Sequence, residues 1–111
     1  MYLFSIHARP IPDSPHFNKL AGAIVETWVN LPDHESAEAR AVEYVSDQLW
    51  HVVEIEHALA IRGGQLAGLD KSQSRLYQEA LERGVAALWT GWPLDGQAGN
   101  VVELRSLNRP S

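Results

Sequence analysis

Four stretches of the chain have the short apolar runs and the boundaries that are typical of β-strands. They cover residues 2–7, 23–31, 52–61 and 85–92. Proline or glycine residues follow each of them, namely Pro10, Pro32, Gly63 with Gly64, and Pro93. The last stretch is apolar at both odd and even positions, which favours a strand covered on both faces. The alternative is that the preceding helix runs on to Leu88.

Residues 52–61 alternate with period two, which predicts a strand with one wetter face. An unbroken alternation puts four apolar residues on one face with two histidines: Val53, Ile55, Leu59, Ile61, His51 and His57. Glu54 and Glu56 then share the opposite face with Val52.

Two segments have helical periodicity and start at a capping residue. Asp33 is the expected N-cap of the first, and a narrow apolar stripe recurs every four residues at Ala37, Ala41, Val45 and Leu49. The small alanines predict a close approach to a sheet. Asp70, with a glutamine three residues later, begins the second helix; its expected buried stripe is Leu76, Tyr77, Ala80 and Leu81, and Gly84 ends it.

The order strand, strand, helix, strand, helix, strand predicts an α+β fold. We expect a four-stranded mixed sheet with two helices on one face, ferredoxin-like or a permuted relative, because right-handed crossovers between neighbouring parallel strands leave both helices on the same side. Residues 1–94 form the predicted single domain, and residues 95–111 a flexible or partner-docked tail. The uncovered sheet face and four tryptophans predict a homodimer.

Composition narrows the functional classes. The chain has 111 residues and a formal net charge of −5, which disfavours nucleic acid and anionic membrane partners. Cysteine is absent, which removes disulfides and thiolate chemistry. No apolar run has the length of a spanning helix, and the first residues lack the pattern of a signal peptide, so we expect a cytoplasmic location.

The acidic residues concentrate in the middle of the chain. Residues 21–61 hold eight acidic residues and one basic residue, a balance of −7, whereas the remainder has a balance of +2. One interpretation is a surface for a basic protein partner, carried by Glu38, Glu43 and Asp47. The other is an ordinary solvated helix face.

Glu26, Glu54 and Glu56 stand out because they interrupt strands that are otherwise apolar. If their strands are neighbours, Glu26 approaches Glu54 or Glu56, and facing carboxylates raise one pKa, as general acid–base catalysis needs. The alternative is a wet sheet face whose charges pair with arginines.

Histidine and serine offer weaker candidates. His51 and His57 are about 20 Å apart along a strand, too far to share a metal ion, although His57 with Glu26 or His7 is geometrically possible. No serine lies in a nucleophile motif and no glycine run has a phosphate-binding pattern. We therefore expect no metal and no cofactor.

Trp89 and Trp92, with Trp28, have three possible roles. They line a pocket for a flat apolar ligand, form a contact with a partner, or fill the core.

The chain resembles a family of small bacterial α+β proteins without assigned activity. The resemblance rests on the strand from Ala23 to Trp28, the acidic helix, the run from Trp50 to Glu56 and the run from Gly84 to Trp89. It covers roughly residues 20–93 and supports the architecture; it implies no functional residue.

Two functional hypotheses follow. The first is a non-enzymatic protein-binding or regulatory domain that uses an acidic surface and an aromatic-rich sheet. The alternative is a small enzyme or ligand-binding protein whose site on the sheet consists of Glu26, Glu54, Glu56 and His57.

Overall fold

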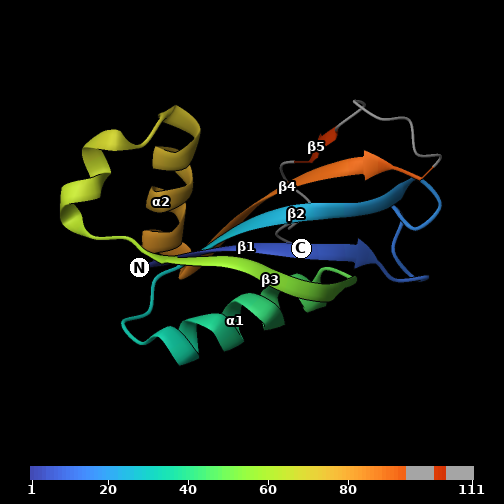
Figure 1. The fold of residues 1–111 in the computed structure, drawn as a ribbon, viewed down its shortest axis with the longest axis horizontal. Helices are drawn as coiled ribbons and strands as arrows, with labels where there is room; N and C mark the ends of the chain where they lie inside the picture. Colours follow the sequence, from blue (N-terminus) through green and yellow to red (C-terminus); the bar gives the residue numbers. More distant parts are fainter. Residues whose placement is uncertain (95–101, 105–111) are drawn as a thin grey trace.

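The computed structural model describes residues 1–94 and 102–104. Its strands form one sheet in the order β3-β1-β2-β4-β5, in which every neighbouring pair is antiparallel (Figure 1). The strands are β1 (Tyr2–Pro10), β2 (Leu20–Val29), β3 (Trp50–Ala60), β4 (Val85–Pro93) and the short β5 (Val102–Leu104). The helices are α1 (His34–Asp47), the 3-10 helix η1 (Gly63–Gly68) and α2 (Lys71–Arg83).

The α+β class is confirmed, as are the four long strands and the two α-helices in their predicted chain order. Residues 85–93 form a strand rather than a helical extension. The prediction of a mixed sheet was wrong, because β3 pairs antiparallel with β1 and β4 pairs antiparallel with β2 on the outer edges of this central pair. The crossovers therefore skip strands instead of joining parallel neighbours, and this strand order does not support the ferredoxin-like relationship.

The helices pack on opposite faces of the sheet, which corrects the expectation of one shared face. Phe4, Ile6 and Ala8 of β1 join the core beneath α1. Leu3 of the same strand, with Trp28 of β2, packs in a second core against α2. Successive side chains of a strand point to opposite faces, so the central strands supply both cores.

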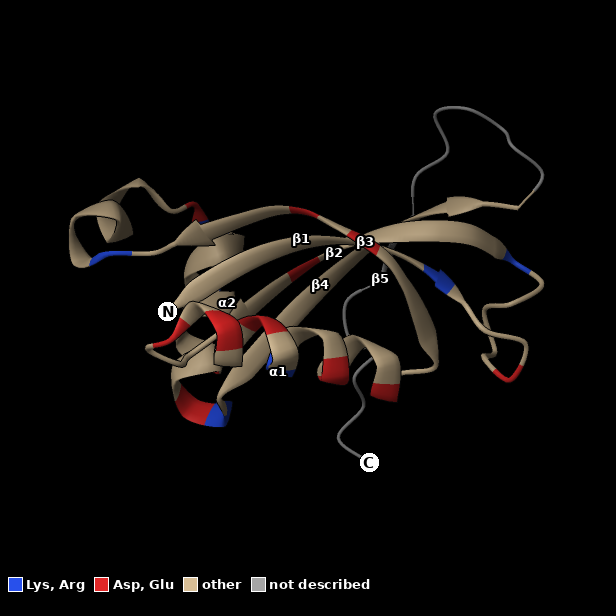
Figure 2. Ribbon diagram, turned by 60° about the horizontal axis from the view of Figure 1, so that its bottom comes forward, with Lys and Arg blue, Asp and Glu red and all other residues tan. Residues whose placement is uncertain are grey.

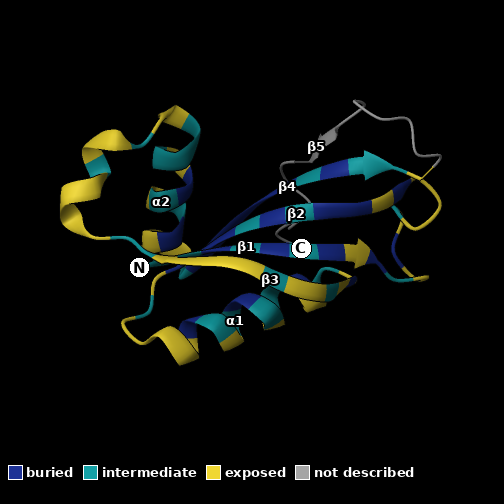
Figure 3. Cartoon of the chain, in the orientation of Figure 1, coloured by how far each residue is buried: buried dark blue, intermediate teal, exposed yellow. Residues whose placement is uncertain are grey.

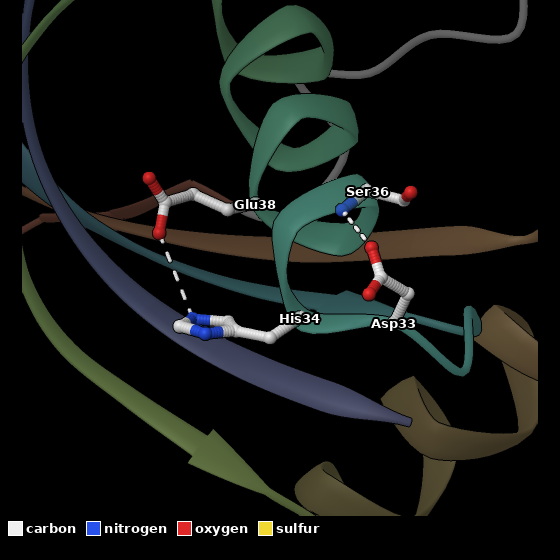
Figure 4. A network of polar contacts seen from close by, with 4 residues as sticks. All are labelled: Asp33, His34, Ser36 and Glu38. Atoms are coloured by element: carbon white, nitrogen blue, oxygen red, sulfur yellow. Dashed lines mark hydrogen bonds and ion pairs between the residues drawn. The ribbon is translucent and has the colours of Figure 1, made fainter.

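The α1 helix begins as predicted. The backbone N–H of Ser36 donates to Asp33 Oδ2 at 2.8 Å, and this hydrogen bond lowers the pKa of Asp33 (Figure 4). Three small or medium residues, Ala37, Ala41 and Val45, are fully buried against the sheet. Leu49 was predicted to extend this stripe, but α1 ends at Asp47 and Leu49 is exposed.

The α2 helix also has the predicted ends. Asp70 and Gln73 form a reciprocal capping box, and Gly84 adopts a left-handed conformation at φ 92°. Leu76 and Ala80 are buried. Leu81 was expected in the buried stripe but is exposed, because α2 covers the sheet along a narrow line.

Residues 102–104 of the predicted tail pair with β4 as β5. The rest of the segment 95–111 lies outside the described residues. Within the described part of the chain, neither α1 nor α2 has the length and apolar composition that crossing a bilayer demands.

Replacing Ala41 by leucine should test the close approach of α1 to the sheet. The added methyl groups have no room beneath the helix, so Ala41→Leu should lower the free energy of unfolding by about 1–3 kcal/mol. Ala39→Leu on the exposed side of α1 is the matched control and should change it by less than about 0.5 kcal/mol. Urea denaturation measures both; equal effects would contradict the packing.

Candidate functional site

Two register shifts in β3 determine which side chains share a face of the sheet. Ser5 lies opposite His57, but the next residue, Ile6, lies opposite Ile55, so Glu56 is passed over. The second shift passes over Val53, because His7 lies opposite Glu54 and Ala8 lies opposite Val52. Each extra residue is what a β-bulge introduces.

These shifts correct the predicted faces of β3. Ile55 and Val52 both pack against the α1 core, although unbroken alternation separates them. Glu54 and His57 both lie on the face opposite α1, because each lies opposite an odd-numbered residue of β1. A carboxylate and an imidazole that were predicted on different faces therefore share one.

Part of this face lies beyond Trp28 and the residues that contact α2. We call this part the open face. Its members are partly buried or exposed, and they come from all four long strands. They are Ser5, His7, Arg9, Ile24, Glu26, His51, Glu54, His57, Thr90 and Trp92. The described helices leave the open face uncovered, since α2 packs on Trp28, Ala86 and Leu88 at one end of the sheet (Figure 1).

Glu26 lies in the middle of β2, the central strand, and is partly buried. Among the described residues it accepts no hydrogen bond and forms no ion pair. Burial raises its pKa, and the negative charge of Asp70 raises it further. Asp70 is the N-cap of α2, and its carboxylate accepts a hydrogen bond from the backbone N–H of Gln73.

The predicted contact between Glu26 and Glu54 or Glu56 was wrong, because β1 lies between their strands. Glu26, Ser5 and His57 lie in one row across the sheet, with Ser5 between the other two. Two strand spacings put the backbones of Glu26 and His57 about 10 Å apart. The raised pKa of Glu26 therefore comes from burial and Asp70, not from a facing strand carboxylate.

Ser5 was not among the predicted site residues, yet it lies between Glu26 and His57. This order does not match a catalytic triad, in which the histidine stands between the nucleophile and the acid. The described residues also contain no hydrogen bond between Ser5 and His57. We therefore assign no nucleophilic role to this row.

Trp92 and His7 form an aromatic pair on the open face. Their ring centroids are 5.5 Å apart at an interplanar angle of 40°. Gly22 makes room for the indole, because a Cβ added there would lie 2.7 Å from Cζ2 of Trp92. A glycine in β2 therefore seats the aromatic side chain that was predicted to contact a partner.

Trp89, also predicted to contact a partner, is fully buried. Its ring lies 6.5 Å from Trp50 and 6.2 Å from Tyr44 in the core beneath α1. It belongs to the core and offers no surface to a partner.

The acidic residues predicted on α1 line the solvent side of the helix (Figure 2). Glu43 pairs with Arg40 at 3.0 Å, and Glu38 lies 3.6 Å from the imidazole of His34 (Figure 4). Asp47 is exposed at the end of the helix. Exposed pairs of this kind contribute little, so this band has the character of a solvated helix face.

Two cavities lie at opposite ends of the sheet. One, of about 540 Å³, adjoins the β1–β2 loop and has a mostly apolar lining with Arg9, Asn18 and His51. The other, of about 390 Å³, lies beside η1 over Leu3, Trp28 and Leu59. Of the three tryptophans predicted as possible pocket residues, Trp28 lines the second cavity, and Trp89 and Trp92 line neither. The available signal for the second cavity was the glycine-rich run from Gly63 to Gly68, which forms η1.

Within the described residues, no group of three or more histidines and carboxylates is close enough to hold a metal ion. Comparisons with protein-family models, curated proteins and solved structures gave no match. The resemblance to a family of small bacterial proteins therefore stays a prediction.

Gly22→Ala should separate Trp92 from His7, because the new Cβ occupies the position of the indole edge. We expect loss of the ring-to-ring nuclear Overhauser effects and a shifted Trp92 Nε1–H resonance. Gly63→Ala is the control, since its added Cβ meets no atom within 4 Å. Retention of the His7–Trp92 contacts in the Gly22 variant would contradict this packing.

Glu26→Gln should stabilise the fold at neutral pH. A folded-state pKa above the usual 4.5 means that ionisation of Glu26 disfavours the folded chain, and this cost develops as pH rises through and above 4.5. The gain in melting temperature of the variant over the wild type should therefore be larger at pH 7 than at pH 4. Thermal unfolding at both values checks this; a gain that shrinks as pH rises refutes it.

Proposed function

We propose that this chain is a non-enzymatic protein-binding domain that holds a basic segment of a partner on its open face. The observation that carries the proposal is the uncovered sheet surface beyond α2, where Trp92, His7 and Glu26 remain partly buried without an overlying described helix. A flat surface of polar and aromatic side chains is the usual composition of a transient protein contact.

The charge of the open face favours a basic partner. It holds Glu26 and Glu54, the bulged Glu56 lies at its margin, and no described lysine lies on it. Its one described arginine, Arg9, lies at the far end opposite His51, two residues beyond His7. Lysine or arginine side chains of a partner would compensate these carboxylates and accelerate association.

The carboxylates on the sheet support this proposal better than those on α1. Glu38 and Glu43 already lie beside His34 and Arg40, so a partner would have to displace existing interactions. Glu26 has no such cation among the described residues, and compensating it would remove the cost of its burial.

A second copy of the chain fits the open face less well. A twofold interface brings the same patch of both subunits together, so the carboxylates of each copy would meet a patch with the same excess of negative charge. The predicted homodimer therefore does not enter this proposal. A catalytic use of Glu26 would need a second acid or base within hydrogen-bond reach, and β1 separates Glu26 from Glu54 and His57.

A selection from a random peptide library on the immobilised domain tests the proposal. Enriched peptides should combine lysine or arginine with apolar residues, and their affinity should fall as salt rises. Replacing both Glu54 and Glu56 by glutamine should weaken the best peptide about three- to tenfold, measured by calorimetry.

The matched control replaces Glu35 and Glu43 by glutamine on α1, which removes the same charge from the other acidic surface. This variant should bind within about twofold of the wild type. Failure to enrich basic peptides, or a larger loss in the α1 variant than in the sheet variant, would overturn the proposal. Sedimentation of the free domain reports whether a second copy occupies the face instead.

A further inference from the structure

The cavity at the β1–β2 loop has a basic corner in a mostly apolar lining. Arg9, near the end of β1, lies directly opposite His51 of β3 in register, and both residues line the cavity. Residues that lie opposite each other in antiparallel strands have Cβ atoms about 5 Å apart on one face of the sheet. The guanidinium and the imidazole can therefore reach the same group of a ligand. The cavity volume of about 540 Å³ is in the range of sites for small molecules.

The guanidinium of Arg9 has no acidic partner. Among the described residues it forms no ion pair, and the side chains of Arg9 and His51 form no hydrogen bond. The β1–β2 loop also contains Asp13 and Lys19, whose opposite charges offset each other and neither of which lines the cavity. The acidic band of α1 lies elsewhere on the molecule (Figure 2). An uncompensated positive charge at a cavity favours an anionic ligand.

The rest of the lining is suited to an apolar group. Leu20 is buried, whereas Phe17 and Leu94 are 40% and 55% exposed although they line the same cavity. A ligand that covers these two side chains removes apolar surface from water, which stabilises the complex. Asn18 adds a side-chain amide to the lining, which can donate a hydrogen bond to an anion.

Backbone hydrogen bonds hold the wall of the cavity in place. The N–H of Ile11 donates to the carbonyl of Leu49, just before β3, at 3.1 Å. The N–H of Leu94, just after β4, donates to the carbonyl of Lys19 at 3.1 Å. The loop is thus attached to the strands on both sides of the central pair. Lining residues that are fixed in advance lower the entropy cost of binding.

We propose that this cavity binds a small organic acid, whose carboxylate is held by Arg9 and His51 and whose apolar part covers Phe17 and Leu94. A guanidinium offers two parallel N–H groups that match the two oxygens of a carboxylate, and a ring N–H of the imidazole adds a third donor. The proposal goes beyond the protein-binding function, because it uses the basic end of the open face and none of the carboxylates on that face.

The surroundings favour a carboxylate over a phosphate group. Arg9 is the only lysine or arginine among the residues that line the cavity, and a dianion would meet the net charge of −5 of the chain. Phosphate sites often use the N–H groups at the start of a helix. None of the described helices begins at this cavity, since their first residues are His34, Gly63 and Lys71.

Titration of the ¹⁵N-labelled chain with 4-phenylbutyrate tests the proposal, with 4-phenylbutan-1-ol and 4-phenylbutylamine as probes of the same skeleton. The acid should bind at least about fivefold more tightly than the alcohol, and the amine more weakly still. The Arg9 Nε–H resonance and the amide resonances of Phe17 and Leu94 should shift. Equal affinity for the three probes, a preference for the amine, displacement by equimolar inorganic phosphate, or shifts confined to the cavity beside η1 would overturn the proposal.

Replacement of the two basic-corner residues identifies the carboxylate contacts. Arg9→Gln should weaken 4-phenylbutyrate about five- to tenfold, and His51→Val, which keeps a good strand former, about two- to fivefold. Neither variant should change the affinity for the alcohol by more than about twofold. Arg75→Gln removes the same charge from an exposed position on α2 and is the matched control, which should bind the acid as the wild type does. Equal losses in Arg9→Gln and Arg75→Gln would contradict the assigned contact.

A further variant blocks the apolar part of the site. Ala21 lines the cavity and is exposed, so Ala21→Phe puts an aromatic ring at its rim without changing the core. This variant should bind neither the acid nor the alcohol, while its melting temperature stays near that of the wild type. Undiminished binding to Ala21→Phe would refute the assigned cavity.

The carboxylate has two possible sources, a free organic acid or the C-terminus of a peptide. N-acetyl-leucyl-phenylalanine, titrated as the free acid and as the amide, distinguishes them. Tighter binding of the peptide acid than of 4-phenylbutyrate indicates a chain terminus, and weaker binding indicates a free acid. Binding of neither acid, or equal binding of the peptide acid and its amide, overturns the inference.

This site and the protein-binding function can fail independently. The variant in which Glu54 and Glu56 are replaced by glutamine should bind 4-phenylbutyrate within about twofold of the wild type. Arg9→Gln should in turn retain the affinity of the wild type for the selected basic peptide. Loss of acid binding in the Glu54 and Glu56 variant would contradict a site built on Arg9 and His51.

Discussion

The antiparallel pairing of β1 with β2 is the interaction on which the rest of the structure depends. Both edges of this central hairpin are used, by β3 on one side and β4 on the other. Because side chains alternate along each strand, the hairpin supplies Phe4 and Ile6 to one core and Leu3 and Trp28 to another. The two helices therefore cannot share a face, and the shorter contact of α2 leaves part of its face uncovered.

Local features of this fold could be predicted from the sequence, because they depend on neighbouring residues. Asp33 and Asp70 begin the helices and Gly84 ends the second one, as their side-chain chemistry dictates. Strand order could not be predicted, since the pairing of β1 with β3 joins residues about fifty positions apart. Nor could the sequence predict which side chains of β3 share a face. The bulges at Glu56 and Val53 each add one residue, which shifts the following side chains to the other face, and the composition of the strand carries no sign of them.

The candidate site shows the same division between local and long-range information. Glu26 stood out in the sequence as a carboxylate in an apolar strand, and the structure gives it a raised pKa. Its neighbour was misidentified, because Asp70 belongs to a helix cap some forty residues away and not to a paired strand. Gly22 had no predicted role, since only the folded sheet brings Trp92 over it.

The outer edge of β3 bears on the tendency of this protein to aggregate. β3 is eleven residues long, mostly exposed, and pairs with a described strand only on its inner side (Figure 3). Strands of other chains can pair with the free backbone groups of a long edge of this kind, and such pairing starts aggregation. The two bulges interrupt the regular spacing of its N–H and C=O groups, and Glu54 and Glu56 add repulsion. The irregularity that puts Glu54 and His57 on the same face thus also protects the edge, so straightening β3 would favour intermolecular sheets.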